Sequence, residues 1–205
     1  MHGLAGQIAR ATLEHLWMVG AAMSIAIVAG VGLGIAITRK QSWRPWVMSA
    51  AGVIQTIPSL ALFGFLIPLP WIGGIGKRTA IVALALYALL PILRNTLTGI
   101  LEVDRAVRES AIAMGMTDRQ VLRGVELPLA ARTILAGIRV AAVTTIGTAT
   151  IAAVIGGGGL GTFIFRGVAT LDTTQILAGA IPSAALALVA EGGLGWIERR
   201  FSPGR

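Results

Sequence analysis

Residues Glu109–Pro128, with the sequence ESAIAMGMTDRQVLRGVELP, form a long polar segment between apolar stretches. We expect Gly115 to end a short helix, because glycine adopts the left-handed backbone conformation that a β-carbon disfavours. Thr117 and Gln120 have the spacing of a capping box, in which the two side chains satisfy free amides at the start of a helix. Pro128 limits how far this second helix continues. The segment therefore predicts a helix–turn–helix unit on a membrane surface.

The composition places the chain in a membrane. Apolar residues make up 55% of the sequence and charged residues 13%, whereas soluble domains carry about 25% charged residues. The chain has no cysteine, and its two histidines, His2 and His15, precede the first long apolar stretch. We therefore expect no metal site and no catalytic residue. The net charge of +8 is spread beside apolar stretches and not gathered in one patch, so nucleic acid is not an expected partner.

The apolar stretches predict an all-α membrane protein with five transmembrane helices. Their approximate bounds are residues 16–38, 46–67, 79–98, 133–155 and 175–196. The first stretch is too long for a signal peptide and is followed directly by Arg39. Residues 1–15 precede the spans, and residues 198–205 form a short polar tail.

The distribution of basic residues predicts the orientation. One side of the predicted membrane collects 11 basic residues: Arg39, Lys40, Arg44, Arg105, Arg108, Arg119, Arg123, Arg132, Arg199, Arg200 and Arg205. The other side has four: Arg10, Lys77, Arg78 and Arg166. Basic loops stay in the cytoplasm. We therefore expect residues 1–15 outside the cell, and the loop 104–128 and the tail 198–205 in the cytoplasm.

The second span carries polar residues near its middle. Gln55 and Ser59 are four residues apart, so they share one face of a helix, and Thr56 and Pro58 lie between them. Polar groups at this depth are costly unless they face protein or water. They favour the lining of a polar path across the membrane. The alternative is a proline kink that neighbouring helices satisfy.

The fourth span contains three threonines, Thr144, Thr145 and Thr148, which helical spacing predicts on one side. They either line a polar path or bond to their own preceding turn. In the first span, Gly30, Gly32 and Gly34 include one GxxxG spacing, which indicates close helix packing. The glycine-rich residues 156–161 lack the preceding strand and the GK[ST] of a phosphate-binding loop.

The segment Glu109–Pro128 resembles the EAA loop of binding-protein-dependent ABC importer permeases. That loop reads EAA, three residues, G, nine residues and I-x-L-P. The corresponding positions here are Glu109, Ser110, Ala111, Gly115, Val125, Leu127 and Pro128. Ser110 replaces the second position and Val125 replaces the isoleucine. The resemblance implies that this loop docks on an ATPase subunit. The alternative is a structural loop that only joins two spans.

The resemblance extends from about residue 16 to residue 196 and implies one domain, residues 16–197, with the type I ABC importer permease fold. Residues 55–61, 89–96, 155–161 and 165–167 are similar to permeases for osmoprotectants such as glycine betaine, carnitine and choline. The alternative is a permease for methionine or another amino acid, because methionine-type permeases share the glycine-rich stretch.

The family resemblance also implies the partners. A dimer of ATPase subunits would bind ATP and magnesium, so this chain itself would be non-catalytic and hold no cofactor. A second permease subunit, identical or related, would complete the path in the cell (inner) membrane, surrounded by lipid. A separate extracytoplasmic binding protein would deliver the solute.

Two other classes compete with a permease. A channel or secondary transporter would need no docking loop and would favour an ion-coupling acid at mid-membrane. Glu191 lies instead toward the cytoplasmic end, where Arg139 is placed to neutralise it. A membrane enzyme would need a catalytic cluster, and the sequence shows none.

Overall fold

The computed structural model describes residues 3–201, and this part of the chain contains helices and no strand. The helices are α1 (Leu4–Arg39), α2 (Arg44–Thr56), α3 (Ser59–Leu66), α4 (Lys77–Leu101), α5 (Arg105–Ala113), α6 (Asp118–Val121), α7 (Leu127–Ala149), α8 (Gly161–Thr170) and α9 (Thr173–Arg200). Short 3-10 turns cover Gln41–Trp43 and Ile151–Ile155, and a π-helical turn covers Leu122–Glu126.

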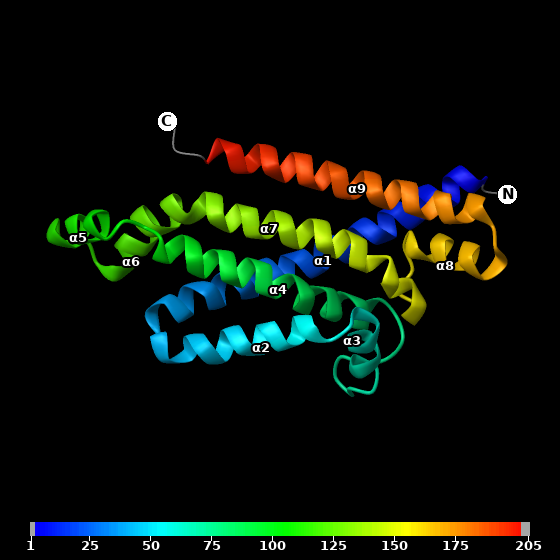
Figure 1. Ribbon diagram of the computed structural model, residues 1–205, viewed down its shortest axis with the longest axis horizontal. Coiled ribbons are helices and arrows are strands. Elements are labelled where there is room, and N and C mark those ends of the chain that lie inside the picture. Colours follow the sequence, from blue (N-terminus) through cyan, green and yellow to red (C-terminus); the bar gives the residue numbers. More distant parts are fainter. Residues whose placement is uncertain (1–2, 202–205) are drawn as a thin grey trace.

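The long helices run along one axis of the molecule. Figure 1 shows α2, α4, α7 and α9 as a row, with α1 crossing behind them. Helices α5 and α6 project at one end of this row, and α8 lies at the other. The N-terminus lies at the α8 end, whereas α9 ends toward α5 and α6.

The second predicted span is broken. Helices α2 and α3 meet at an angle of 104°, whereas four other helical stretches, α1, α4, α9 and the continuous run Asp118–Ala149, are long and apolar enough to cross a membrane. Five spans result only if the bent pair counts as one. Ile57 has extended backbone angles, φ −72° and ψ 126°, because a residue that precedes proline avoids the helical region. The span expected for residues 46–67 is therefore two helices joined at Pro58, the residue at which the sequence predicts a kink.

The first helix also differs from its expected bounds. Helix α1 begins at Leu4 and is 36 residues long, which corresponds to roughly 54 Å against a hydrocarbon core of about 30 Å. Residues 4–15 therefore continue the first spanning helix beyond the length that the bilayer requires. Their polar side chains are accommodated: Glu14 pairs with Arg10 and Lys77, and the buried His15 places Nε2 3.1 Å from the carbonyl oxygen of Ile146.

Pro128 does not stop the second helix of the loop. It lies in the first turn of α7, which follows the π-helical turn Leu122–Glu126 without interruption. Proline is tolerated here because the preceding turn is π-helical, with the Leu127 amide bonded to the carbonyl oxygen of Leu122, and such a turn accommodates the hydrogen bond that proline cannot make. The expectation that Pro128 limits this helix is therefore wrong, and one helical path leads from α6 through the turn into the membrane.

Small residues allow α1 to pack closely on α4. A β-carbon on Gly30 would lie 2.8 Å from the side chain of Ile92, and one on Gly34 would lie 2.6 Å from that of Thr96. Gly32 has no atom within 4 Å of this position. The GxxxG pair Gly30 and Gly34 therefore packs α1 on α4, as predicted, while Gly32 does not.

Candidate coupling loop and transport face

The loop between α4 and α7 forms two short helices with a sharp turn. Asp104 caps α5, since its Oδ1 accepts a hydrogen bond of 2.8 Å from the amide of Ala106. Gly115 has φ +83°, which confirms the predicted left-handed helix end. Thr117 and Gln120 form the predicted capping box, in which Gln120 Oε1 accepts from the amide of Thr117 at 2.8 Å. Local sequence signals therefore set the shape of this loop.

A buried acid holds the loop on the spans. Glu126 has no exposed surface, and its carboxylate pairs with Arg39 at the end of α1 and with Arg108 of α5. Arg108 also donates to the carbonyl oxygen of Ile100 in α4 at 3.1 Å. Sequence reasoning missed Glu126, although an isolated acid between Val125 and Leu127 is a signal of this kind. Three helices thus meet at one carboxylate beside the start of α7.

The first residues of the EAA-like pattern have different environments. Glu109 is 61% exposed and pairs with Arg105 of the same helix at 2.7 Å. Ser110 donates to the carbonyl oxygen of Ala106 at 2.8 Å, and Ala111 is buried. The structure therefore gives Ala111 a packing role, while the carboxylate of Glu109 stays at the surface.

The last residues of the pattern follow Glu126. Leu127 is half-buried and packs against a small core that includes Ile100 and Ala130. Pro128 is exposed in the first turn of α7. Leu127 and Pro128 therefore follow Glu126 in the chain, but none of the described side-chain hydrogen bonds or ion pairs joins a predicted loop residue to its carboxylate.

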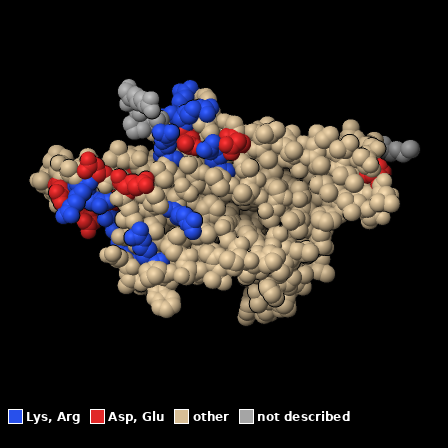
Figure 2. Space-filling view, in the orientation of Figure 1, with Lys and Arg blue, Asp and Glu red and all other residues tan. Residues whose placement is uncertain are grey.

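Helix α5 exposes apolar side chains at the charged end of the molecule. Val107, Ile112 and Met114 are 42%, 53% and 76% exposed. In the view of Figure 2, most lysine, arginine, aspartate and glutamate side chains gather at this end. Exposed apolar side chains therefore accompany the charged ones at this end.

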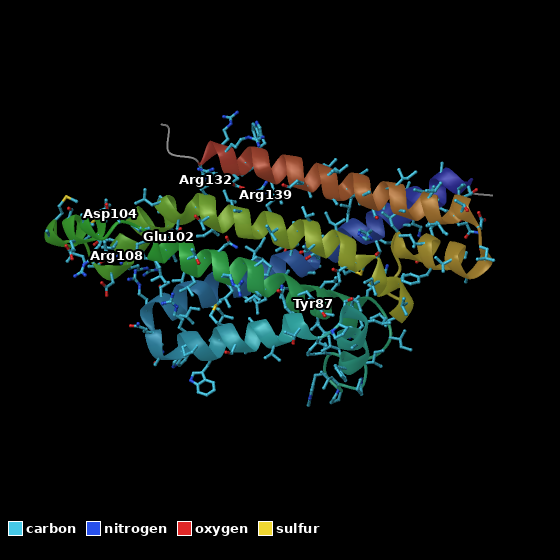
Figure 3. The ribbon with its side chains drawn as sticks, in the orientation of Figure 1. Tyr87, Glu102, Asp104, Arg108, Arg132 and Arg139 are labelled. Carbon is cyan, nitrogen blue, oxygen red and sulfur yellow. The ribbon has the colours of Figure 1, made fainter. Side chains whose placement is uncertain are left out.

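The polar residues of the second span lie at the break between α2 and α3. Gln55 donates from Nε2 to the carbonyl oxygen of Tyr87 in α4 at 2.9 Å, and the Tyr87 hydroxyl donates to the carbonyl oxygen of Ile57. Gln55, Thr56 and Pro58 are exposed, and Ser59 is half-buried. Tyr87, labelled in Figure 3, thus anchors the break, and sequence reasoning did not assign it this role.

The threonines of α7 do not all share one face. Thr144 is exposed and Thr148 is half-buried, but Thr145 is buried in the core. The grouping of Thr145 with the other two is therefore wrong, because adjacent helical positions point about 100° apart. Thr144 donates to the carbonyl oxygen of Val140 and Thr148 to that of Thr144, each at 2.9 Å. None of the described hydrogen bonds connects this pair with the Gln55 region.

A charge network joins α7 to α9. Arg139 Nη1 lies 2.7 Å from Glu191 Oε1, which confirms the predicted neutralisation of this acid. Arg139 Nη2 also lies 3.1 Å from Glu198 Oε2, and Arg132 pairs with the same residue at 3.7 Å. Figure 3 shows Arg132 and Arg139 in the space between the two helices.

The family model for the binding-protein-dependent transport system inner membrane component matches residues 24–203. The chain belongs to this family. It is a membrane permease subunit, and the segment Glu109–Pro128 between α4 and α7 resembles the EAA loop, with Ser110 and Val125 at the two positions that depart from the pattern.

Several curated permeases resemble this permease over nearly its whole length. The carnitine transport permease protein OpuCD of Listeria monocytogenes is 48% identical over 191 residues, which cover 93% of this chain and 84% of the relative. The glycine betaine/carnitine/choline transport system permease protein OpuCD of Bacillus subtilis is 46% identical and covers 97% and 86%. The osmoprotectant import permease protein OsmW of Salmonella typhimurium is 45% identical and covers 96% and 91%.

Solved structures show the same fold. The permease matches a chain of the inward-facing MetNI methionine ABC transporter with a TM-score of 0.89 and 22% identity, over 99% of this chain and 100% of that chain. It also matches an amino acid ABC transporter with histidines, with a TM-score of 0.80 and 19% identity, over 96% and 94%. The fold is that of the type I ABC importer permeases.

Proposed function

We propose that this permease is the membrane subunit of an ATP-driven, binding-protein-dependent importer of osmoprotectants of the glycine betaine, carnitine and choline class. The observation that carries this proposal is the identity of 45–48% with permeases named for these solutes. The methionine and amino acid transporters share only 19–22%, so the methionine-type alternative has the weaker support.

The loop 104–128 is the docking site for an ATPase dimer, which binds ATP and magnesium in place of this chain. Two features support this assignment. The apolar side chains of Val107 and Ile112 on α5, and of Met114 directly after it, are exposed outside the apolar spans. The Glu126 carboxylate links α5 to the last residue of α1 and to the start of α7. A movement of α5 would therefore displace two spanning helices.

The orientation follows from the charges. The basic residues concentrate at the end that carries α5 and α6 (Figure 2), which the positive-inside rule places in the cytoplasm. The N-terminal end of α1 and helix α8 then face outside, where a separate binding protein delivers the solute. A second permease subunit, identical or related, closes the path in the cell membrane.

Tight binding of the solute resides in the binding protein. A quaternary ammonium group donates no hydrogen bond, so tight recognition usually requires an aromatic cage. This permease contains only 5% aromatic residues and a single tyrosine, Tyr87. The Tyr87 hydroxyl already donates a hydrogen bond to the carbonyl oxygen of Ile57. The membrane subunit therefore offers a polar passage and not a cage.

The test is solute uptake by the intact complex. The complex is purified from its native membrane by a tag on this permease. It is then reconstituted in liposomes that contain ATP, and its binding protein is added. We expect ATP-dependent uptake of labelled glycine betaine, carnitine or choline that excess methionine does not inhibit. Inhibition by methionine, with none by betaine, would establish the methionine-type alternative instead.

A further inference from the structure

Three sides of α4 are covered by neighbouring helices. Gly30 and Gly34 bring α1 against Ile92 and Thr96. A β-carbon on Gly137 of α7 would lie 2.5 Å from Asn95. Helix α2 packs on a third side through a small core that contains Ala51, Val47, Met48, Leu90, Leu93 and Leu97.

The fourth side of α4 is open and carries an arginine. Arg94 and Thr98 are exposed, and Tyr87 precedes Arg94 by seven residues, close to two helical turns. This side lies between the α2-facing and α7-facing positions and opposite the α1-facing one. Figure 1 shows the same order, with α4 between α2 and α7 and with α1 behind them.

Arg94 makes no side-chain hydrogen bond or ion pair with any residue of the described range 3–201. Arg139, which also lies on a spanning helix, pairs with Glu191 and Glu198. Arg94 lies seven residues before the end of α4 at Leu101, roughly 10 Å along the axis. An arginine inside a span normally faces protein or water and marks a solute or ion path.

The surroundings of Arg94 favour a water-filled path over lipid. On the side opposite α1, Thr98 is exposed one turn after Arg94, and Gln55 of α2 bonds to Tyr87 two turns before it. Thr144 is exposed on α7, two turns from Gly137. The apolar side chains exposed on these faces, Leu101 and Val140, lie about one turn from the polar ones. Between residues 13 and 33 the exposed large side chains of α1 are apolar and include Trp17, Ile25, Val28 and Leu33. Lipid suits the α1 side, whereas the polar side suits a path closed by the second permease subunit.

We propose that Arg94 contacts the carboxylate of a zwitterionic solute, such as glycine betaine or carnitine, as it passes through the permease. This inference rests on the proposed function. The planar guanidinium group binds a carboxylate through two hydrogen bonds. The carboxylate is also the end of the solute that a passage without an aromatic cage can hold. Choline has no carboxylate, so it gains nothing from Arg94 and its positive charge is repelled.

The test compares glycine betaine and choline uptake by the complete complex with Arg94→Gln and Arg94→Lys. We expect Arg94→Gln to lower the ratio of betaine to choline uptake about tenfold or more, as for loss of a hydrogen bond to a charged group. Arg94→Lys should retain part of the ratio because it keeps the charge. Arg78→Gln, an exposed arginine in the first turn of α4, is the matched control and should leave the ratio unchanged.

A ratio tells specificity apart from folding, because a loss of folded complex lowers both uptake rates equally. An unchanged ratio in Arg94→Gln overturns the role of Arg94, and so does wild-type uptake of choline without any carboxylate-bearing solute. Both results leave the proposed function intact. A wild-type complex that transports no quaternary ammonium solute contradicts the proposed function itself.

Discussion

The Nε atom of Arg108 lies 2.7 Å from Oε1 of Glu126, whose side chain is wholly buried. Arg39 binds the other carboxylate oxygen. A buried charge is tolerated only when it is paired, so these two arginines are needed where they lie. The position of α5 relative to α1 and α7 is thereby set by a single acid.

Glu126→Gln tests this role. The change leaves two arginines without their acid, and removal of one partner of a buried pair costs about 3 kcal/mol. We expect a lower midpoint of thermal unfolding in detergent. Glu109→Gln is the control, because Glu109 is 61% exposed in a surface pair that contributes about 1 kcal/mol or less. Equal midpoints for the two variants would show that Glu126 does not hold the loop.

Gly115 should be intolerant of a β-carbon. At φ +83°, an L-residue costs roughly 1–2 kcal/mol, although no atom lies near the added group. We therefore expect Gly115→Ala to reduce ATP-driven uptake and Gly115→Val to abolish it while the permease stays in the membrane. Gly124→Ala, whose β-carbon meets only the end of Met116 at 3.4 Å, should keep uptake. Similar uptake by Gly115→Val and the wild type would remove the coupling role of this turn.

Single cysteines test the orientation, since the chain has none of its own. Thr117 and Thr170 are both exposed, in the loop before α6 and at the end of α8. In intact cells, an impermeant thiol reagent should label Thr170→Cys and not Thr117→Cys. Permeabilised cells should show labelling of both. Labelling of only Thr117→Cys from outside would reverse the topology.

Gln55→Leu tests the polar break between α2 and α3. If Gln55 lines the path, the change should slow uptake several-fold while the ATPase still binds, because an apolar group replaces a polar one in a hydrated passage. If Gln55 only packs on Tyr87, the loss of its 2.9 Å hydrogen bond should lower stability by about 1 kcal/mol. Uptake per folded complex would then be unchanged, as measured by transport and thermal unfolding on the same preparation.

Local signals predicted local features well. Gly115, the Thr117 and Gln120 capping box and the Gly30 and Gly34 packing each depend on one residue type at one spacing. The family pattern located the loop itself. Features set by partners far along the chain were missed: the burial of Glu126 depends on Arg39, 87 residues away.

The break at Pro58 shows the same limit. The proline predicted a kink or a polar lining, but the 104° bend goes beyond what a proline kink alone implies. Tyr87 of α4 binds the carbonyl oxygen of Ile57 and accepts from Gln55, so the bend depends on a helix that follows later in the chain. The extension of α1 to Leu4 was likewise hidden, since the burial of His15 against α7 is a tertiary contact.

Docking of the ATPase on α5 is tested most directly by co-purification. Ile112→Asp places a charge on an apolar side chain that is 53% exposed, so the fold should tolerate it. Val168→Asp makes the same kind of change on α8 at the opposite end, where the side chain is 55% exposed. We expect the tagged wild-type permease and Val168→Asp to co-purify equal amounts of the ATPase. The amount that co-purifies with Ile112→Asp should be at least tenfold lower than with the wild type. Undiminished ATPase with Ile112→Asp would contradict docking on this helix.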